Sequence, residues 1–182
     1  MNSTHTMYEA ANRPLTAVLD GVPHDSWTNP SPCEGWAARD VVRHLIETQR
    51  DFLTKHGVDL GGPSDVDNDP AAAWADHSKR VTAAVSDDAV AGRAFDGHFG
   101  PTTVGATLEQ FYVFDMIVHR WDVARAVGGD TDLSGSELDR LEAGADSFGE
   151  ALYMDGVCAP AVEAPEGADR AVRMLARLGR TA

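Results

Sequence analysis

The sequence predicts an all-α protein: a four-helix bundle with minor extra helices and one short hairpin. Three observations support this fold class. Apolar residues recur at helical spacing along most of the chain, strand-like alternation is scarce, and capping residues and glycines fall between the periodic segments. The length suits one domain, and we expect a single helical domain over residues 1–182.

The first expected helix covers residues 4–20, where apolar side chains recur every three or four positions and Pro14 could introduce a kink. Turn-forming residues 21–35 follow, and their three prolines predict an ordered, irregular loop. The second helix covers residues 37–55 and ends at Gly57, because glycine commonly terminates helices.

The third helix begins at Asp69 and Pro70, since Asp is a favoured cap and proline is tolerated in the first turn, and it continues to Val85. Residues 93–99 suit a short strand or one arm of a hairpin. A long helix over residues 105–127 is almost entirely apolar and is expected to be buried. Two further helices are expected over residues 134–152 and 168–178.

Charge excludes several classes of partner. The chain has 15 basic and 29 acidic residues, a net charge of −14. Phosphate backbones and anionic membranes require clustered cations, so nucleic acid and membrane surfaces are not expected partners. The acidic stretch 130–169 is followed by an arginine-rich segment, 170–180, and we expect these arginines to pair with the acidic face.

Targeting and redox signals point to the cytoplasm. The N-terminus lacks a basic region followed by an apolar run, and no apolar stretch is long enough to span a membrane. Two cysteines are too few for a disulfide framework. We therefore expect a reduced, cytoplasmic setting.

The segment 111–128 is the most informative, because three ionisable side chains interrupt an apolar helix. Asp115, His119 and Asp122 are spaced four and three residues apart. At about 100° per residue they lie within roughly 60° of one another around the helix axis. Buried charges need a partner, either a divalent metal ion or salt bridges to arginine. The candidate arginines are Arg43, Arg120 and Arg125.

A metal site would need a ligand from another segment as well. His44, in the string DVVRHLIETQ, lies at the flank of the second helix's apolar stripe. It is the candidate, because metal sites in bundles are built from facing helices. Cys33 could ligate metal, but structural packing in a rigid loop beside Trp36 is the favoured interpretation. The remaining histidines lack such a setting: His5, His24, His56, His77 and His98.

Three strings together resemble a known family: SPCEGWAARDVVRHL, FDMIVHRWDVARAVG and ADRAVRMLARLGR. They are similar to the N-terminal metal-binding domain of mycothiol-dependent maleylpyruvate isomerases, which belong to the DinB-like superfamily of metal-binding four-helix bundles. The resemblance extends over nearly the whole chain. It implies a divalent ion, usually zinc, held by His44, Asp115 and His119. These isomerases generally carry Glu at the position of Asp115.

Ligands of this kind do not select sharply among divalent ions, so nickel is an alternative to zinc. The resemblance implies a metal-dependent enzyme of the mycothiol-dependent isomerase or thiol-transferase type, acting on a small electrophilic substrate. Asp122 is then expected to orient a ligand histidine or to move protons. The alternatives are a metal-dependent hydrolase or cyclase that uses bound water, and a non-catalytic bundle that binds metal or a small molecule. We expect a monomer or a homodimer.

Overall fold

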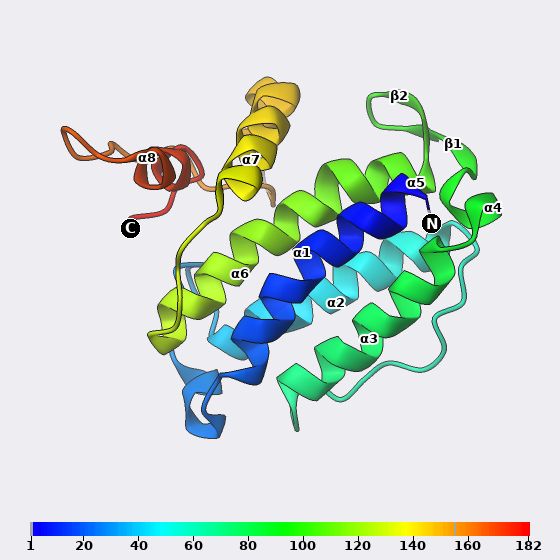
Figure 1. Ribbon diagram of the computed structural model, residues 1–182, viewed down its shortest axis with the longest axis horizontal. Coiled ribbons are helices and arrows are strands. Elements are labelled where there is room, and N and C mark those ends of the chain that lie inside the picture. Colours follow the sequence, from blue (N-terminus) through cyan, green and yellow to red (C-terminus); the bar gives the residue numbers. More distant parts are fainter. Residues whose placement is uncertain (1, 155) are drawn as a thin grey trace. The chain divides into compact units, whose positions relative to one another are not determined.

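The computed structural model describes residues 2–154 and 156–182 (Figure 1). These residues are mostly helical, and the sheet within them is a single two-stranded hairpin, which confirms the all-α prediction. Two compact units, Met1–Thr131 and Asp132–Ala182, are considered one at a time. The expectation of one domain over residues 1–182 stays a prediction. None of the helices in the described ranges combines the length and apolarity needed to cross a membrane.

Four long helices form the bundle of the first unit: α1 (Ser3–Asp20), α2 (Ala38–Lys55), α3 (Pro70–Val85) and α6 (Val113–Val127). Helices α1 and α2 each pack against both α3 and α6 (Figure 1), so the order around the bundle is α1, α3, α2, α6. Helix α6 is buried continuously from Met116 to Ala124, as the apolar sequence predicts. Charged side chains within this buried stretch must therefore find their partners inside the protein.

The helix starts follow the capping rules. Asp69 caps α3 by accepting a hydrogen bond from the Ala72 amide at 3.0 Å, and Pro70 occupies the first position, as the sequence predicts. Asn2 caps α1, and its side chain accepts from the His5 amide at 2.9 Å. These contacts satisfy amides that have no partner within their own helices.

Helix α6 continues an irregular segment. Helix α5 (Val104–Thr107) leads into η2 (Leu108–Tyr112), which is π-helical, and then into α6. The sequence predicted one uniform helix over residues 105–127. A π-turn accommodates an extra residue, which helical periodicity does not encode, and such turns occur frequently at functional sites.

Short elements occupy the predicted loops. Residues expected to be irregular contain η1 (His24–Thr28), and a short helix, α4 (Asp88–Ala91), follows α3. The predicted strand is one arm of a hairpin formed by β1 (Ala94–Gly97) and β2 (Gly100–Thr103), in antiparallel register. The expected hairpin is thus confirmed.

The second unit contains α7 (Gly135–Phe148), η3 (Gly149–Tyr153) and α8 (Arg170–Arg177). The predicted helix over 134–152 is therefore α-helical only to Phe148. Arg170 pairs with the carboxylates of Asp139 and Glu142. Arg177 pairs with Asp146 at 2.7 Å, so the expected pairing with acidic residues is confirmed for Arg170 and Arg177.

A polar cluster lies inside the bundle, between α1, α2 and α3. Tyr8 donates a hydrogen bond to Oε1 of Gln49 at 2.9 Å, and Nε2 of His77 lies 3.0 Å from the same oxygen. All three residues are fully buried. His77 belongs to the charged run DHSKR, so its burial was not predicted. Burial, together with the charge of Arg50, lowers the pKa of His77 from 6.5 to about 4.

This low pKa predicts a specific acid sensitivity. Because His77 binds its proton more weakly in the folded state than in the unfolded state, its contribution to stability is present above pH 6.5 and is lost as the pH falls towards 4. The loss is on the order of 3 kcal/mol. In His77→Gln, the free energy of unfolding, measured by urea titration between pH 7 and 4, should fall less than in the wild type by about this amount. His24→Gln, at an exposed position, is the control, and parallel pH profiles for wild type and His77→Gln would contradict the interpretation.

Candidate metal centre

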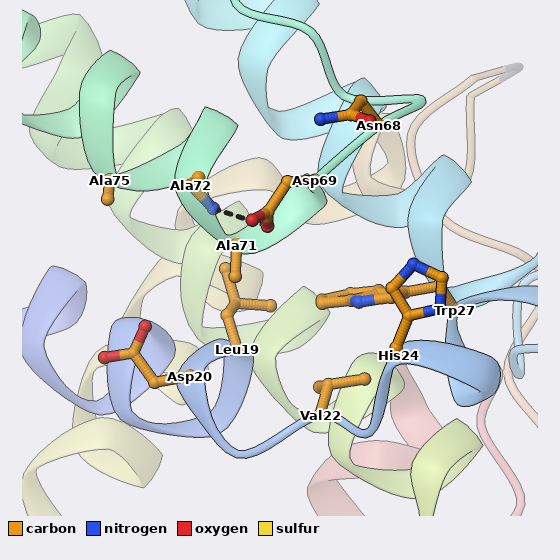
Figure 2. Close-up of a pocket in the computed structure, with 10 residues that line it drawn as sticks. All are labelled: Leu19, Asp20, Val22, His24, Trp27, Asn68, Asp69, Ala71, Ala72 and Ala75. Atoms are coloured by element: carbon orange, nitrogen blue, oxygen red, sulfur yellow. Dashed lines mark hydrogen bonds between the residues drawn. The ribbon is translucent and has the colours of Figure 1, made fainter.

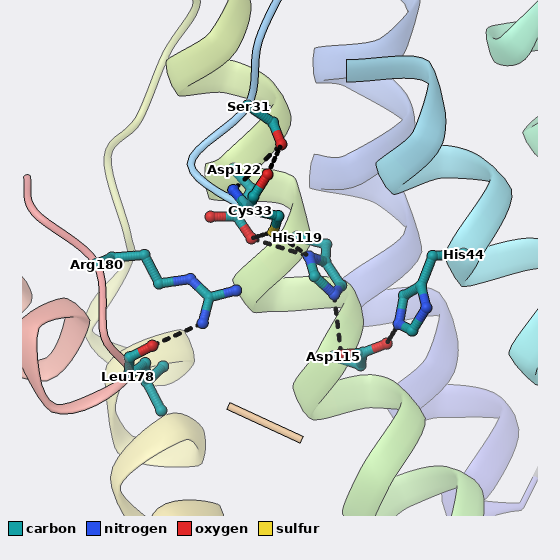
Figure 3. A network of polar contacts seen from close by, with 8 residues as sticks. All are labelled: Ser31, Cys33, His44, Asp115, His119, Asp122, Leu178 and Arg180. Atoms are coloured by element: carbon teal, nitrogen blue, oxygen red, sulfur yellow. Dashed lines mark hydrogen bonds and ion pairs between the residues drawn. The ribbon is translucent and has the colours of Figure 1, made fainter. Parts of the chain in front are cut away.

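The predicted ligands lie together. Helix α6 carries Asp115 and His119 on one face, and α2 brings His44 beside them (Figure 3). One oxygen of Asp115 accepts from Nε2 of His44 at 3.2 Å, and its other oxygen accepts from Nε2 of His119 at 3.2 Å. One donor atom from each residue lies within 4.8 Å of the others. We refer to His44, Asp115 and His119 as the open trio.

The other nitrogen of His119 faces a second carboxylate. Its Nδ1 donates to Oδ2 of Asp122 at 2.8 Å. The thiol of Cys33 donates to the same oxygen at 3.4 Å, and its sulfur lies 3.9 Å from Nδ1 of His119 (Figure 3). We refer to Cys33, His119 and Asp122 as the thiol trio. His119 is common to both trios.

The two trios differ in burial. The side chain of Asp122 is fully buried and that of His119 is 8% exposed. In the open trio, by contrast, the side chains of His44 and Asp115 are 26% and 31% exposed. Cys33 is partly exposed, so the thiol trio has one partly exposed residue and the open trio has two.

The charges of this cluster are mutually compensated. Burial alone would raise the pKa of Asp115, but the positive charge and hydrogen bond of His119, and the hydrogen bond of His44, hold it well below its usual range. Burial alone would lower the pKa of His119, but Asp115, Asp122 and Cys33 together raise it well above 6.5. With both ring nitrogens donating, His119 is an imidazolium between two carboxylates.

The donor set suits a divalent cation. Two imidazole nitrogens and one carboxylate oxygen are ligands that zinc and nickel accept, and three protein ligands leave a coordination position free. The carboxylates of Asp115 and Asp122 stabilise a positive charge on His119, and they would equally stabilise a metal cation that replaces its proton. Arg43, one of the candidate salt-bridge partners, instead bonds with Asp40 and Asp67.

A short closed loop supplies Cys33. Pro30 and Ala37 pair across it, and the Trp36 amide donates to the Cys33 carbonyl at 3.0 Å. The turn between them requires a positive φ, which Gly35 adopts at +77°. Structural packing was the favoured interpretation of this loop, with metal ligation by Cys33 as the alternative. Its contact with Asp122 depends on tertiary packing, and the only sequence signal was the string PCEGW next to the helix of His44.

Two aromatic residues also flank the open trio, and the sequence did not single them out as site residues. The ring of Trp36 lies 5.0 Å from that of His44 and is tilted against it. Tyr112 ends the π-turn one helical turn before Asp115 and stacks on Phe52 at 5.0 Å. Burial and the negative charge of Asp115 raise the pKa of Tyr112, so its phenol stays protonated at neutral pH.

A separate hollow of about 400 Å³ lies between the end of α1, η1 and the start of α3 (Figure 2). Leu19, Val22 and Trp27 give it apolar walls, and Asp20 and Asp69 line it as well. None of its lining residues belongs to either trio. It is therefore distinct from the candidate metal centre.

Fold and cluster together define a helical bundle with a histidine- and carboxylate-rich centre on its two facing helices, α2 and α6. The family model of the mycothiol maleylpyruvate isomerase N-terminal domain matches residues 8–124, and the chain belongs to this family. The match includes every residue of both trios. Searches of curated proteins and of solved structures gave no significant match.

Proposed function

We propose that this chain is a metal-dependent enzyme that uses a low-molecular-weight thiol, with mycothiol as the candidate. It would either isomerise a small electrophilic substrate or transfer the thiol to it. The observation that carries the proposal is the open trio. It offers three suitable donors with two of them partly exposed, in a chain of the mycothiol maleylpyruvate isomerase N-terminal domain family.

Under this proposal His44, Asp115 and His119 hold the ion, with zinc expected and nickel the alternative. When bound, the ion would favour the anionic form of a thiol at its free position, and a thiolate adds readily to an electrophilic carbon. The partial exposure of His44 and Asp115 would give thiol and substrate a route to that position.

The surrounding residues would fix the ligands. Asp122 accepts a hydrogen bond from Nδ1–H of His119, and this contact orients the ring so that Nε2 faces Asp115. Trp36 packs against the ring of His44 and restricts its rotation. Tyr112 keeps its proton, so it could donate a hydrogen bond to an anionic group of the substrate.

The first prediction from this proposal concerns metal content. The purified wild-type chain should contain about one divalent ion, measured by elemental analysis, because three protein ligands define one site. His44→Ala and His119→Ala should each lose most of it, and His98→Ala, in the hairpin turn, is the matched control. Stoichiometric zinc in the double variant His44→Ala, His119→Ala would place the ion elsewhere.

The second prediction concerns Asp122. Asp122→Asn should retain the ion but weaken metal affinity or turnover by about 10–100-fold, because a neutral amide replaces the carboxylate that orients His119 and raises its basicity, while the three ligands remain. A competition titration with a chromophoric chelator measures the affinity. Complete loss of metal from a folded Asp122→Asn variant would show that Asp122 is itself a ligand and that the site is closed.

The third prediction concerns thiol dependence. The zinc form, incubated with mycothiol and an electrophilic unsaturated acid, should convert the acid at a rate that increases with thiol concentration, whereas His44→Ala should show only the background rate. Product formation is measured by chromatography, with His98→Ala as the control. Equal, thiol-independent rates for wild type and His44→Ala would exclude thiol transfer and leave the hydrolase and binding-bundle alternatives.

A further inference from the structure

His119 has two ring nitrogens, and each faces a complete set of donors. Nε2 belongs to the open trio, and Nδ1 belongs to the thiol trio with Cys33 and Asp122. The open trio accounts for the proposed function. The thiol trio supplies a different donor set, one sulfur, one nitrogen and one oxygen, in a more buried position.

The spacing of the thiol trio is compatible with direct ligation. For an ion of the size of zinc, bonds of about 2.3 Å to sulfur and about 2.0 Å to nitrogen or oxygen in a tetrahedral site place ligand atoms roughly 3.3–3.6 Å apart. The Cys33 sulfur lies 3.4 Å from the Asp122 oxygen and 3.9 Å from Nδ1 of His119. The His119–Asp122 separation, 2.8 Å, would have to open by a few tenths of an ångström.

We propose that the thiol trio is a second metal site, selective for thiophilic ions such as Cd²⁺, because a cysteine sulfur is a soft ligand that the open trio lacks. Binding exchanges protons for metal without electron transfer. The thiol proton of Cys33 and the Nδ1 proton of His119 pass to solvent. His119 keeps its Nε2 proton, which the Asp115 oxygen at 3.2 Å accepts.

The shared histidine makes the two sites mutually exclusive. A neutral imidazole offers one lone pair, so His119 can bind an ion through Nε2 or through Nδ1. With an ion at the open trio, Asp122 accepts a hydrogen bond from Nδ1–H of His119. With an ion at the thiol trio, Asp115 accepts a hydrogen bond from Nε2–H. Each carboxylate is thus a ligand in one state and the partner that orients His119 in the other.

The test is a titration of the metal-free full-length chain with Cd²⁺, followed by ultraviolet absorption from thiolate-to-cadmium charge transfer. The band should saturate at one ion per chain and should disappear in Cys33→Ser, a change that keeps a hydroxyl donor towards Asp122. Cys158→Ser is the matched control, because Cys158 is the other cysteine of the sequence and belongs to the second unit. Absence of the band in the wild type, its persistence in Cys33→Ser or its loss in Cys158→Ser would each overturn the proposal.

Two further measurements separate this site from the open trio. In His44→Ala the cadmium–thiolate band should remain, although the proposed function predicts loss of zinc from this variant. When Cd²⁺ is added to the zinc-loaded wild type, the cadmium–thiolate band should appear only as zinc is released. The sum of bound zinc and cadmium should stay at one ion per chain. Two ions bound at once would refute exclusivity, whereas a cadmium–thiolate band in a chain that binds no zinc would sustain this site and refute the proposed function.

Discussion

The structure of the first unit depends on how the charges of Asp115, His119 and Asp122 are compensated inside α6. An isolated buried carboxylate is strongly unfavourable, and it persists only where donors or opposite charges satisfy it. His119 donates to both carboxylates, through one ring nitrogen each. The two carboxylates also accept hydrogen bonds from other segments: Asp115 from His44 of α2, and Asp122 from Cys33 of the loop after η1. The cluster thereby fixes where α2 and this loop meet α6.

The same arrangement gives α6 a closed end and an accessible end. Asp122 is fully buried, so its carboxylate is held in one environment and can orient His119 without competition from water. About two turns earlier on α6, Asp115 is partly exposed. Tyr112 lies one turn before it on the same continuous helical segment, and Trp36 packs against the ring of His44. A rigid support next to a reachable group is the arrangement that a binding or catalytic site requires.

Much of this could be predicted from sequence, because it depends on local rules. Apolar spacing located the four long helices, Asp69 and Pro70 marked a helix start, and the spacing of Asp115, His119 and Asp122 placed them on one face. The contact of Cys33 with Asp122, the burial of His77 and the π-turn at residues 108–112 could not be predicted. Each depends on which distant segment packs nearby, and periodicity carries no information about that.

The aspartate at position 115, where related isomerases generally carry glutamate, fits the observed geometry. A side chain one methylene shorter reaches less far, but Asp115 does not need to reach: each of its oxygens already lies 3.2 Å from one imidazole. The rings of His44 and His119 stand 5.0 Å apart, so both converge on the carboxylate. Under the proposed function, an ion would take the place of the ring protons between these groups. The shorter side chain of Asp115 is therefore long enough in this chain, because both imidazoles already lie at its carboxylate.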